Sequence, residues 1–372
     1  MKIAIAKGNL QVPPTYFAIT HAERMKDKHD FQFFTLNANV ATGVTELVIR
    51  QATPGGNLLG FDRKNMFMPL FEKRMAAQIR RFDPDVIHQH FATWSNAAVS
   101  ASRATSAPLI VTVHGADVHL MSSGLQSPMA ERNRRSVSNA LKQSKRVLAV
   151  SKYLADKAMT AGADPKKVEI HYQGIDTDVF FPGSLEVFDA EPQVLFVGNH
   201  SIAKGARDVF LASVQAYSHV AHKLIMVGGG PLVEELRSEA LSYQHIEVLG
   251  SKDRSQIRQL LQSSTVFMSA SQLHNGWTEA AGLVNLEAQA CGLPVVGYAN
   301  GGIPEMVSSE ASTLVEEGDI TNLGHALTEA LQLSRSEQIR TREAARRFAV
   351  DERSLQLSCQ QLDGFYNDVL AD

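Results

Sequence analysis

The stretch GWTEAAGLVNLEAQACG, Gly276–Gly292, places two carboxylates, Glu279 and Glu287, among small and apolar residues. It follows the apolar run TVFMSAS, which is typical of a buried strand. The segment GLVNLEAQA is rich in helix formers, and a glycine and then a proline follow it, which is a common helix stop. The sequence therefore predicts a strand, a loop that holds Glu279, and a helix that begins near Gly282 and carries Glu287.

Two carboxylates in these positions could hold a ligand between them. On one continuous helix, residues eight apart lie about 12 Å apart along the axis and roughly 80° apart around it, too far to hold one small group. If the helix begins between them, its free N–H groups and positive dipole end point between the acids. Such a site suits an anion flanked by hydroxyl groups, as in a nucleotide sugar. Spacing alone favours the alternative, a solvated loop acid and a helix-surface acid.

Strand-like and helix-like segments alternate along the rest of the chain. Apolar runs such as residues 2–6, 109–115 and 193–199 are separated by helical patterns, for example 65–82 and 127–143. Alternation of this kind predicts an α/β fold with parallel sheets that helices cover on both faces.

One segment interrupts the alternation and predicts a domain boundary. Residues 180–193, FFPGSLEVFDAEPQ, contain two prolines and no clear period. We therefore expect an N-terminal domain, residues 1–181, and a C-terminal domain, residues 182–350, followed by a last helix over about 351–372. Ligands bind doubly wound sheets at the carboxyl ends of the strands, so the loops after strands should hold the site.

The composition is that of an ordinary globular protein, with 44% hydrophobic and 20% charged residues among 372. The cysteines, Cys291 and Cys359, are too few for a disulfide framework or a Cys-rich metal site, and they suit a reducing compartment. Only four apolar residues separate Lys2 from Lys7, too few for a signal peptide, and no run approaches the roughly 18–20 apolar residues of a membrane span. We expect a cytoplasmic protein that touches membrane only at its surface.

The formal net charge of −3 hides an asymmetry between the two halves. Residues 1–180 carry 23 Lys and Arg against 15 Asp and Glu, a net +8, while residues 181–372 carry 13 against 24, a net −11. Lys73–Phe82 places four positive charges around an apolar stripe, and Glu131–Arg146 has a net charge of +5. This surface could contact anionic lipid, and a solvated helix face explains it equally well. The charge is not interleaved with aromatics and the pI is about 6.5, which argues against nucleic-acid binding.

Several motifs, in their order along the chain, resemble the retaining glycosyltransferases of family 4, whose fold is GT-B. The opening stretch resembles their E-x7-E motif, and VGNHSIAKGARDVFLA resembles their V-G-R-L-x-x-x-K-G segment. IMVGGGPLVEEL, EAQACGLPVVGYANGGIPEMV and HYQGIDTDVFFP resemble further motifs of the family. HQHFATWSNAA and VTVHGADVHL are similar to the variants, of the colanic-acid type, that build bacterial exopolysaccharide and lipopolysaccharide.

The resemblance implies two doubly wound, Rossmann-like domains that face each other across a cleft, with the C-terminal helix packed back on the N-terminal domain. It implies that the N-terminal domain binds the acceptor and that the C-terminal domain binds the nucleotide-sugar donor. The implied reaction moves a hexosyl group from a UDP- or GDP-linked donor to a saccharide or lipid-linked acceptor in glycan biosynthesis, with retention. The implied enzyme uses no catalytic metal and no cofactor other than its donor substrate.

The resemblance also assigns roles to donor-binding residues. Glu279, with the backbone of Gly282 and Leu283, would hold the donor sugar and phosphate, and Glu287 would hold the ribose hydroxyls. Lys204 would neutralise the diphosphate. A positioned cation stabilises the leaving group most as the glycosidic bond breaks, because its negative charge grows at that moment.

Three histidines and two Asp-x-Asp sequences are further candidates for site residues. By resemblance, His114 would lie against the donor sugar and help to position the reacting centre, whereas the residues alone favour a strand-end histidine with local partners. His88 and His90 alternate on one strand face, where core packing or cleft lining is favoured over a metal site because no third ligand is evident. Two Asp-x-Asp sequences, residues 83–85 and 176–178, mimic a metal-binding motif, and we expect both to be structural.

The sequence departs from the family pattern in two places. The family usually has an arginine where this chain has Asn199, which supplies neither charge nor a guanidinium fork. Either Arg207 compensates, or phosphate stabilisation is weaker, or catalysis is impaired. The segment after the first strand has a single Gly8 in place of a Gly-rich loop, and it faintly resembles an acceptor loop near Thr15. The alternatives to a transferase are a non-catalytic sugar-nucleotide-binding protein and a nucleotide-sugar epimerase of GT-B fold.

Overall fold

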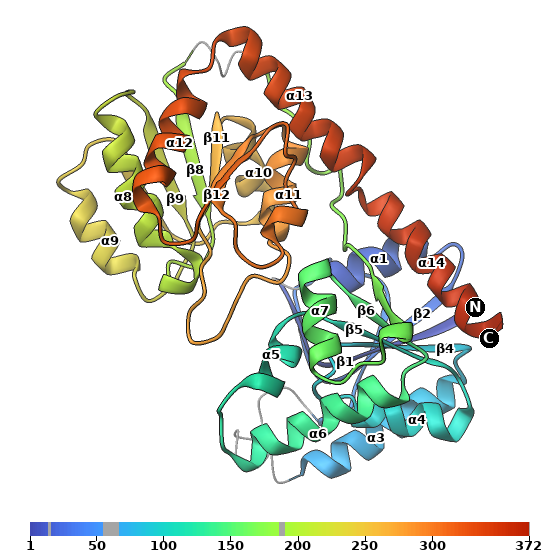
Figure 1. Ribbon diagram of the computed structural model, residues 1–372. Coiled ribbons are helices and arrows are strands. Elements are labelled where there is room, and N and C mark those ends of the chain that lie inside the picture. Colours follow the sequence, from blue (N-terminus) through green and yellow to red (C-terminus); the bar gives the residue numbers. More distant parts are fainter. Residues whose placement is uncertain (14–15, 55–66, 186–189, 372) are drawn as a thin grey trace. The chain divides into compact units, whose positions relative to one another are not determined.

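The computed structural model describes residues 1–13, 16–54, 67–185 and 190–371 (Figure 1). The chain divides into two compact units: Met1–Gln173 with Ser358–Asp372, and Gly174–Leu357. Thr15, considered above for acceptor handling, lies outside the described residues.

The first unit contains a sheet of seven parallel strands in the order β3-β2-β1-β4-β5-β6-β7. The strands are β1 (Lys2–Val12), β2 (Asp30–Val40), β3 (Val48–Gln51), β4 (Val86–His90), β5 (Leu109–Val113), β6 (Arg146–Ala149) and β7 (Val168–Ile170). The helices between them are α1 (Phe17–Met25), α3 (Met68–Phe82), α4 (Asn96–Thr105), α5 (Ala116–Ser122), α6 (Pro128–Gln143) and α7 (Lys152–Thr160). Every residue of β4 and β5 is buried, as expected of strands covered on both faces.

The C-terminal helix α14 (Leu355–Ala371) completes the first unit from residue 358 onward. Asp363 accepts hydrogen bonds from Lys28 Nζ and His29 Nε2, both at 2.6 Å. The hydroxyl of Tyr366 lies 2.8 Å from His88 Nδ1 inside the core. These contacts confirm that the C-terminal helix packs back on the N-terminal unit.

The second unit contains a sheet of six parallel strands in the order β10-β9-β8-β11-β12-β13. The strands are β8 (Gln193–Val197), β9 (Lys223–Val227), β10 (Ile246–Leu249), β11 (Val266–Ser269), β12 (Val295–Tyr298) and β13 (Thr313–Val315). The helices are α8 (Ala206–Tyr217), α9 (Val233–Ala240), α10 (Arg254–Gln262), α11 (Leu283–Ala290), α12 (Ile320–Gln332) and α13 (Arg335–Asp351). Two parallel-sheet units confirm the expected α/β class.

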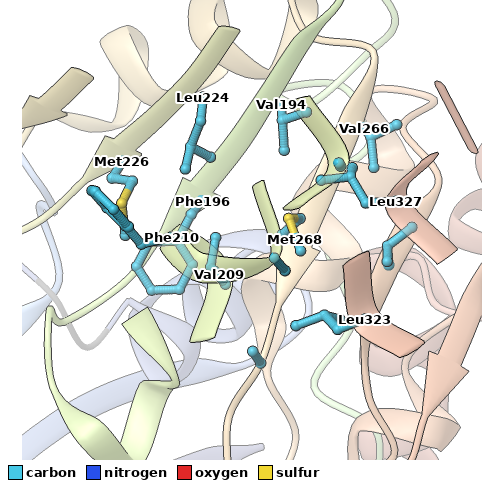
Figure 2. Close-up of a cluster of buried hydrophobic side chains, with 14 of the residues drawn as sticks. Val194, Phe196, Val209, Phe210, Leu224, Met226, Val266, Met268, Leu323 and Leu327 are labelled. Atoms are coloured by element: carbon cyan, nitrogen blue, oxygen red, sulfur yellow. The ribbon is translucent and has the colours of Figure 1, made fainter. Parts of the chain in front are cut away.

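The core of the second unit forms where apolar strand residues meet two helices (Figure 2). Strand side chains alternate across the sheet, so every second residue of a strand faces the same helices. The buried set includes Val194, Phe196, Leu224, Met226, Val266 and Met268 from the strands, Val209 and Phe210 from α8, and Leu323 and Leu327 from α12. This packing fixes the strand ends from which the site loops leave.

The observed boundary between the units lies at Gly174, earlier than the expected position after residue 181. The reason is a pairing of Ile175 with the segment where α13 gives way to α14. Ile175 N donates to Arg353 O, and Leu355 N donates to Ile175 O, both at 2.8 Å. The segment that enters the second unit is therefore already tied to it before the proline-containing stretch begins.

In both sheets the strand order reverses between two central strands, β1 and β4 in the first unit and β8 and β11 in the second. A reversal of this kind opens a crevice at the carboxyl ends of the strands, and ligands bind doubly wound sheets there. Each unit therefore has its own topological switch point where a ligand site is expected.

The cysteines, the Asp-x-Asp sequences and the lengths of the helices bear on further expectations from the sequence. Cys291 and Cys359 are both buried, and they do not form a disulfide with each other. Asp85 accepts a hydrogen bond from Lys2 N at 2.7 Å, and Asp176 accepts one from Asp178 N at 3.1 Å, so an aspartate of each Asp-x-Asp sequence binds a backbone N–H group. Across the described residues, no helix is long and apolar enough to span a bilayer.

Candidate active site

Lys204 is fixed at the carboxyl end of β8 by the glycine that follows it. A short 3₁₀ turn, Ile202–Lys204, ends at Gly205, whose φ of +62° leads directly into α8. A Cβ atom at residue 205 would lie only 1.9 Å from Ala270 O, just beyond β11. Only glycine fits this close approach, so Lys204 is held where the loops after β8 and β11 meet.

Glu279 lies in the loop between β11 and α11, and the helix begins directly after Gly282, as the sequence predicts. The main chain of Glu279 is held on both sides. Its N–H donates to Asn300 Oδ1 at 3.2 Å, and its carbonyl accepts from Gly302 N at 2.9 Å. Asn300 in turn donates to Glu317 at 2.5 Å. This second layer of bonds fixes the position of the carboxylate before any ligand binds.

Lys204 and Glu279 form a direct ion pair, in which the ammonium donates to Oε2. Ser271 Oγ donates to the same oxygen at 3.3 Å, and the ammonium lies 4.8 Å from the centre of the Trp277 ring. The Lys204 side chain is 30% exposed and that of Glu279 is 13% exposed, so solvent and ligands can reach the pair. The sequence predicted both residues as donor ligands, but not that they contact each other.

Gly282 and Leu283 form the start of α11 beside this pair. Gly282 adopts φ +71°, and a Cβ there would lie 3.3 Å from Glu279 Cγ. Among the described residues, no side chain caps the N-terminus of α11. The first N–H groups of the helix therefore remain available to an anion held next to Glu279.

Glu287 lies in the second turn of α11 and is partly buried. Burial raises the pKa of its carboxyl to about 7, against the opposing effect of Arg254. A carboxyl with this pKa is partly protonated near neutral pH. A ligand that donates hydrogen bonds to its ionised form would lower that pKa.

Asn199 and Arg207, the two residues weighed for the phosphate charge, make different contacts. Asn199 is exposed, and its Oδ1 lies 2.8 Å from where a Cβ at Gly230 would be, in the loop after β9. Arg207 pairs with Glu235 at 2.5 Å and with Glu239 at 3.1 Å, both on α9. The guanidinium is thus bound by two acids of α9, while Lys204 is the cation bound to Glu279.

Sequence reasoning missed three side chains of this region. Ser271 and Trp277, which contact the ion pair, stand in the same loop as Glu279, and the aromatic ring inside GWTE is a usable signal for a cation contact. His200 follows Asn199 and is fully buried, and both ring nitrogens lack hydrogen-bond partners within the described residues. No feature of the sequence marks His200, because its burial depends on the loop after β9.

His114 belongs to the first unit, directly after β5. Its ring stacks on Phe17 and Phe91, with centroid distances of 4.5 and 4.3 Å. Gln173 Nε2 donates to His114 Nδ1 at 3.2 Å, so His114 Nε2 carries the proton and donates to His90 Nδ1 at 3.1 Å. Burial, with the nearby charge of Lys7, holds the pKa of His114 well below its ordinary value. Both nitrogens thus have local partners, and a role against the donor sugar stays a prediction.

Comparison with known proteins decides the family. The family described as Glycosyltransferase Family 4 matches residues 16–179, and Glycosyl transferases group 1 matches residues 180–348. The chain belongs to glycosyltransferase family 4. The recognised resemblance is therefore confirmed, and the chain is an enzyme of the glycosyltransferase class.

This glycosyltransferase is similar to two curated bacterial enzymes. It is 28% identical over 321 residues to N-acetyl-alpha-D-glucosaminyl L-malate synthase of Bacillus anthracis, which covers 80% of this chain and 78% of that protein. It is 29% identical over 286 residues to D-inositol 3-phosphate glycosyltransferase of Mycobacterium leprae, which covers 69% of this chain and 62% of that protein.

Solved structures confirm the GT-B fold of this glycosyltransferase. The Anabaena HepE protein, determined in complex with UDP and glucose, superposes with a TM-score of 0.77 at 18% identity. The match covers 98% of this chain and 99% of HepE. At this identity the likeness concerns the fold, and the substrates have to be argued from the site.

Proposed function

We propose that this glycosyltransferase moves a hexosyl group, with retention, from a UDP- or GDP-sugar to a saccharide or lipid-linked acceptor in glycan biosynthesis. The observation that carries the proposal is the Lys204–Glu279 ion pair beside the uncapped start of α11. A cation, a carboxylate and free N–H groups at one switch point match the diphosphate and hydroxyls of a nucleotide sugar. UDP-sugars are the first donors to test.

In the proposed donor complex, the diphosphate replaces Glu279 as the ion-pair partner of Lys204. The freed Glu279 carboxylate then accepts hydrogen bonds from the sugar hydroxyls, and the backbone of Gly282 and Leu283 faces a phosphate oxygen. Glu287 accepts bonds from the ribose hydroxyls. Asn199 supplies a hydrogen bond without charge, so Lys204 is the main side-chain cation on the leaving group.

The proposed reaction needs no strong carboxylate base at the anomeric carbon. The acceptor hydroxyl attacks that carbon on the face from which the leaving group departs, and the configuration at the carbon is therefore retained. The bond from the carbon to the phosphate oxygen breaks, the bond to the acceptor oxygen forms, and the departing phosphate takes the hydroxyl proton. Lys204 stabilises this step because the phosphate is more negative in the transition state than in the bound donor.

We propose that transfer is independent of a metal ion. Lys204 and the start of α11 would supply the positive charge that a divalent cation supplies to diphosphates elsewhere. Transfer should therefore survive EDTA with at most a modest loss. Complete loss that Mn²⁺ or Mg²⁺ restores would refute this part of the proposal.

The test of the function is an assay of donor consumption with and without acceptors. UDP-glucose, UDP-N-acetylglucosamine and GDP-mannose are incubated with a panel of saccharide and lipid-linked acceptors, and released nucleotide and product are both measured. Transfer to an acceptor with retained configuration supports the proposal. Donor that is bound but never consumed would indicate the non-catalytic binding protein instead. Conversion of donor without any acceptor would indicate the epimerase.

We also propose a cytoplasmic location with peripheral contact to anionic membrane. Phe67, which directly precedes α3, and Leu70, Arg74 and Arg81 on α3 are exposed and spaced to share one helix face, a pattern that suits a lipid surface. Sedimentation with vesicles that contain phosphatidylglycerol, but not with neutral vesicles, would support this contact. Equal recovery of wild type and Arg74→Glu/Arg81→Glu in the vesicle pellet would contradict it.

A further inference from the structure

Lys7 is a buried lysine to which the described part of the chain offers no counter-ion. Lys7 is only 5% exposed, and burial lowers the pKa of its ammonium to about 8. The ammonium lies 5.1 Å from the ring centres of both Phe17 and Phe91. Throughout the described ranges, the structure records no ion pair or hydrogen bond for its Nζ. A buried cation in such a position is costly unless an anion or other acceptor joins it.

The position of Lys7 is the switch point of the first unit. Its strand β1 lies between β2 and β4, and Lys7 pairs in register with His90, the last residue of β4. Phe91 follows β4, His114 follows β5, and Phe17 begins α1. Loops at the carboxyl ends of neighbouring strands therefore surround the ammonium, as they surround ligands in doubly wound sheets.

The groups that face Lys7 leave its hydrogen-bonding capacity unused. His90 and His114 are the titratable neighbours, and the charge of Lys7 contributes to lowering the pKa of both. His114 Nε2 bonds to His90 and His114 Nδ1 bonds to Gln173, so both ring nitrogens of His114 already have partners. An ammonium has three donors, so Lys7 can bind two or three oxygen atoms at once. Phe17, Phe91 and His114 are each partly exposed, so the edge of this cluster is open to solvent.

We propose that Lys7, between Phe17 and Phe91, binds an anionic oxygen group of the acceptor, a carboxylate or a phosphate. The statement that the anion belongs to the acceptor rests on the proposed glycosyl transfer; the statement that Lys7 binds an anion does not. The two relatives support it, because L-malate and inositol 3-phosphate, which their names contain, are both anionic. The flanking rings reduce access of water, and a charge-assisted bond is stronger in such surroundings than in bulk solvent.

Direct binding can be tested without any transferase activity. The full chain is labelled with [ε-¹³C]lysine, and the Lys7 signal is assigned by its absence in Lys7→Met. The signal is followed through pH titrations with inorganic phosphate, with L-malate and with neutral myo-inositol. Phosphate or malate should raise the pKa of Lys7 by roughly one unit or more, because an opposite charge in contact favours the ammonium. Lys73, exposed on the same unit, is the control and should move little.

The comparison of probes separates the sources of the anion. A larger effect of malate assigns a carboxylate, and a larger effect of phosphate assigns a phosphorylated acceptor. A Lys7 signal that no anion moves, or that myo-inositol moves equally, would overturn the proposal. The titration itself uses the wild-type chain, and Lys7→Arg, which keeps the charge, provides the same assignment if Lys7→Met does not fold.

Kinetics test the assignment to the acceptor. With a UDP-sugar donor, Lys7→Met should raise KM for a phosphorylated acceptor roughly tenfold or more relative to its neutral counterpart, the loss expected of a charge-assisted bond. The circular dichroism spectrum and the thermal unfolding transition of the whole chain check that the variant is folded. An equal rise for charged and neutral acceptors would contradict the assignment. If the anions move the Lys7 signal but wild type consumes no donor with any acceptor, the proposed function fails while the anion site stands.

Discussion

The ammonium of Lys204 donates directly to Oε2 of Glu279, a residue 75 positions further along the chain. This ion pair joins the loop after β8 to the loop after β11. Both side chains remain partly exposed, so solvent and a ligand can reach the two charges. Hydrogen bonds that Lys204 donates to a diphosphate are each worth about 1.5–3 kcal/mol, so a nucleotide-sugar donor can displace Glu279. The pair therefore preorganises the two groups without blocking the exchange that the proposed function requires.

Lys204→Ala should abolish transfer. The leaving diphosphate would then be stabilised by backbone N–H groups and Asn199 alone, at a cost of about 3 kcal/mol or more, over roughly a hundredfold in kcat. Steady-state assays of Lys204→Ala and of Lys223→Ala, an exposed lysine of the same unit, provide the comparison. Donor turnover that ignores the loss of Lys204 would place the diphosphate elsewhere.

Asn199→Arg should raise kcat or leave it unchanged. The side chain of Asn199 is exposed beside the loop after β9, so a longer side chain can be accommodated, and a second cation suits the same leaving group. Single-turnover rates of the variant and of Asn199→Gln, which adds length without charge, separate the two effects. A marked fall in the arginine variant alone would show that Asn199 serves the site by its neutral hydrogen bond.

Glu287 should make nucleotide binding depend on pH. Its carboxyl has a pKa raised to about 7 by burial, and the ribose hydroxyls need the ionised form as acceptor. UDP affinity should therefore increase several-fold from about pH 6 to about pH 8, and binding should release protons. Calorimetric titrations in buffers of different ionisation enthalpy measure both effects. Glu287→Gln should bind more weakly at the higher pH and lack this part of the pH dependence; an unchanged profile would remove Glu287 from the site.

The first unit should lose stability in mild acid. Burial lowers the pKa of His88 and of His171 to about 3, whereas their unfolded values lie near 6.5. The unfolded chain binds more protons between these values, so stability decreases as pH falls below about 6.5, by up to about 1.4 kcal/mol per pH unit for each histidine. Urea unfolding from pH 7.5 to pH 5 measures this slope.

A matched variant tests the contribution of one histidine. His88→Gln removes the proton-binding site and should reduce the acid slope, even if it lowers stability at pH 7.5 by breaking the bonds to Tyr366 and Thr112. An identical slope in both proteins would mean that His88 is already protonated in the folded state or that other groups dominate.

Local patterns in the sequence determined much of this protein. Apolar periodicity predicted strands that the structure contains, and the helix formers after Gly282 predicted the start of α11. The predicted helix over 127–143 is α6, with Ser127 as its N-cap. These features depend on residues within one or two turns of each other, so the local chain encodes them. The Glu pair and the Lys-Gly sequence also marked the site loops.

Only the tertiary structure decided which of these residues meet. Lys204 reaches Glu279 because β8 and β11 are neighbours in the sheet, and no local pattern contains that strand order. Arg207 is bound by two acids of α9 that lie 28 and 32 positions further along the chain, and no local pattern indicates that contact. The sequence placed Lys7 just after the first predicted strand, yet it lies within β1 and is buried between two rings from separate elements. Contacts between distant segments follow from sheet topology and packing, and those are properties of the whole fold rather than of any stretch of sequence.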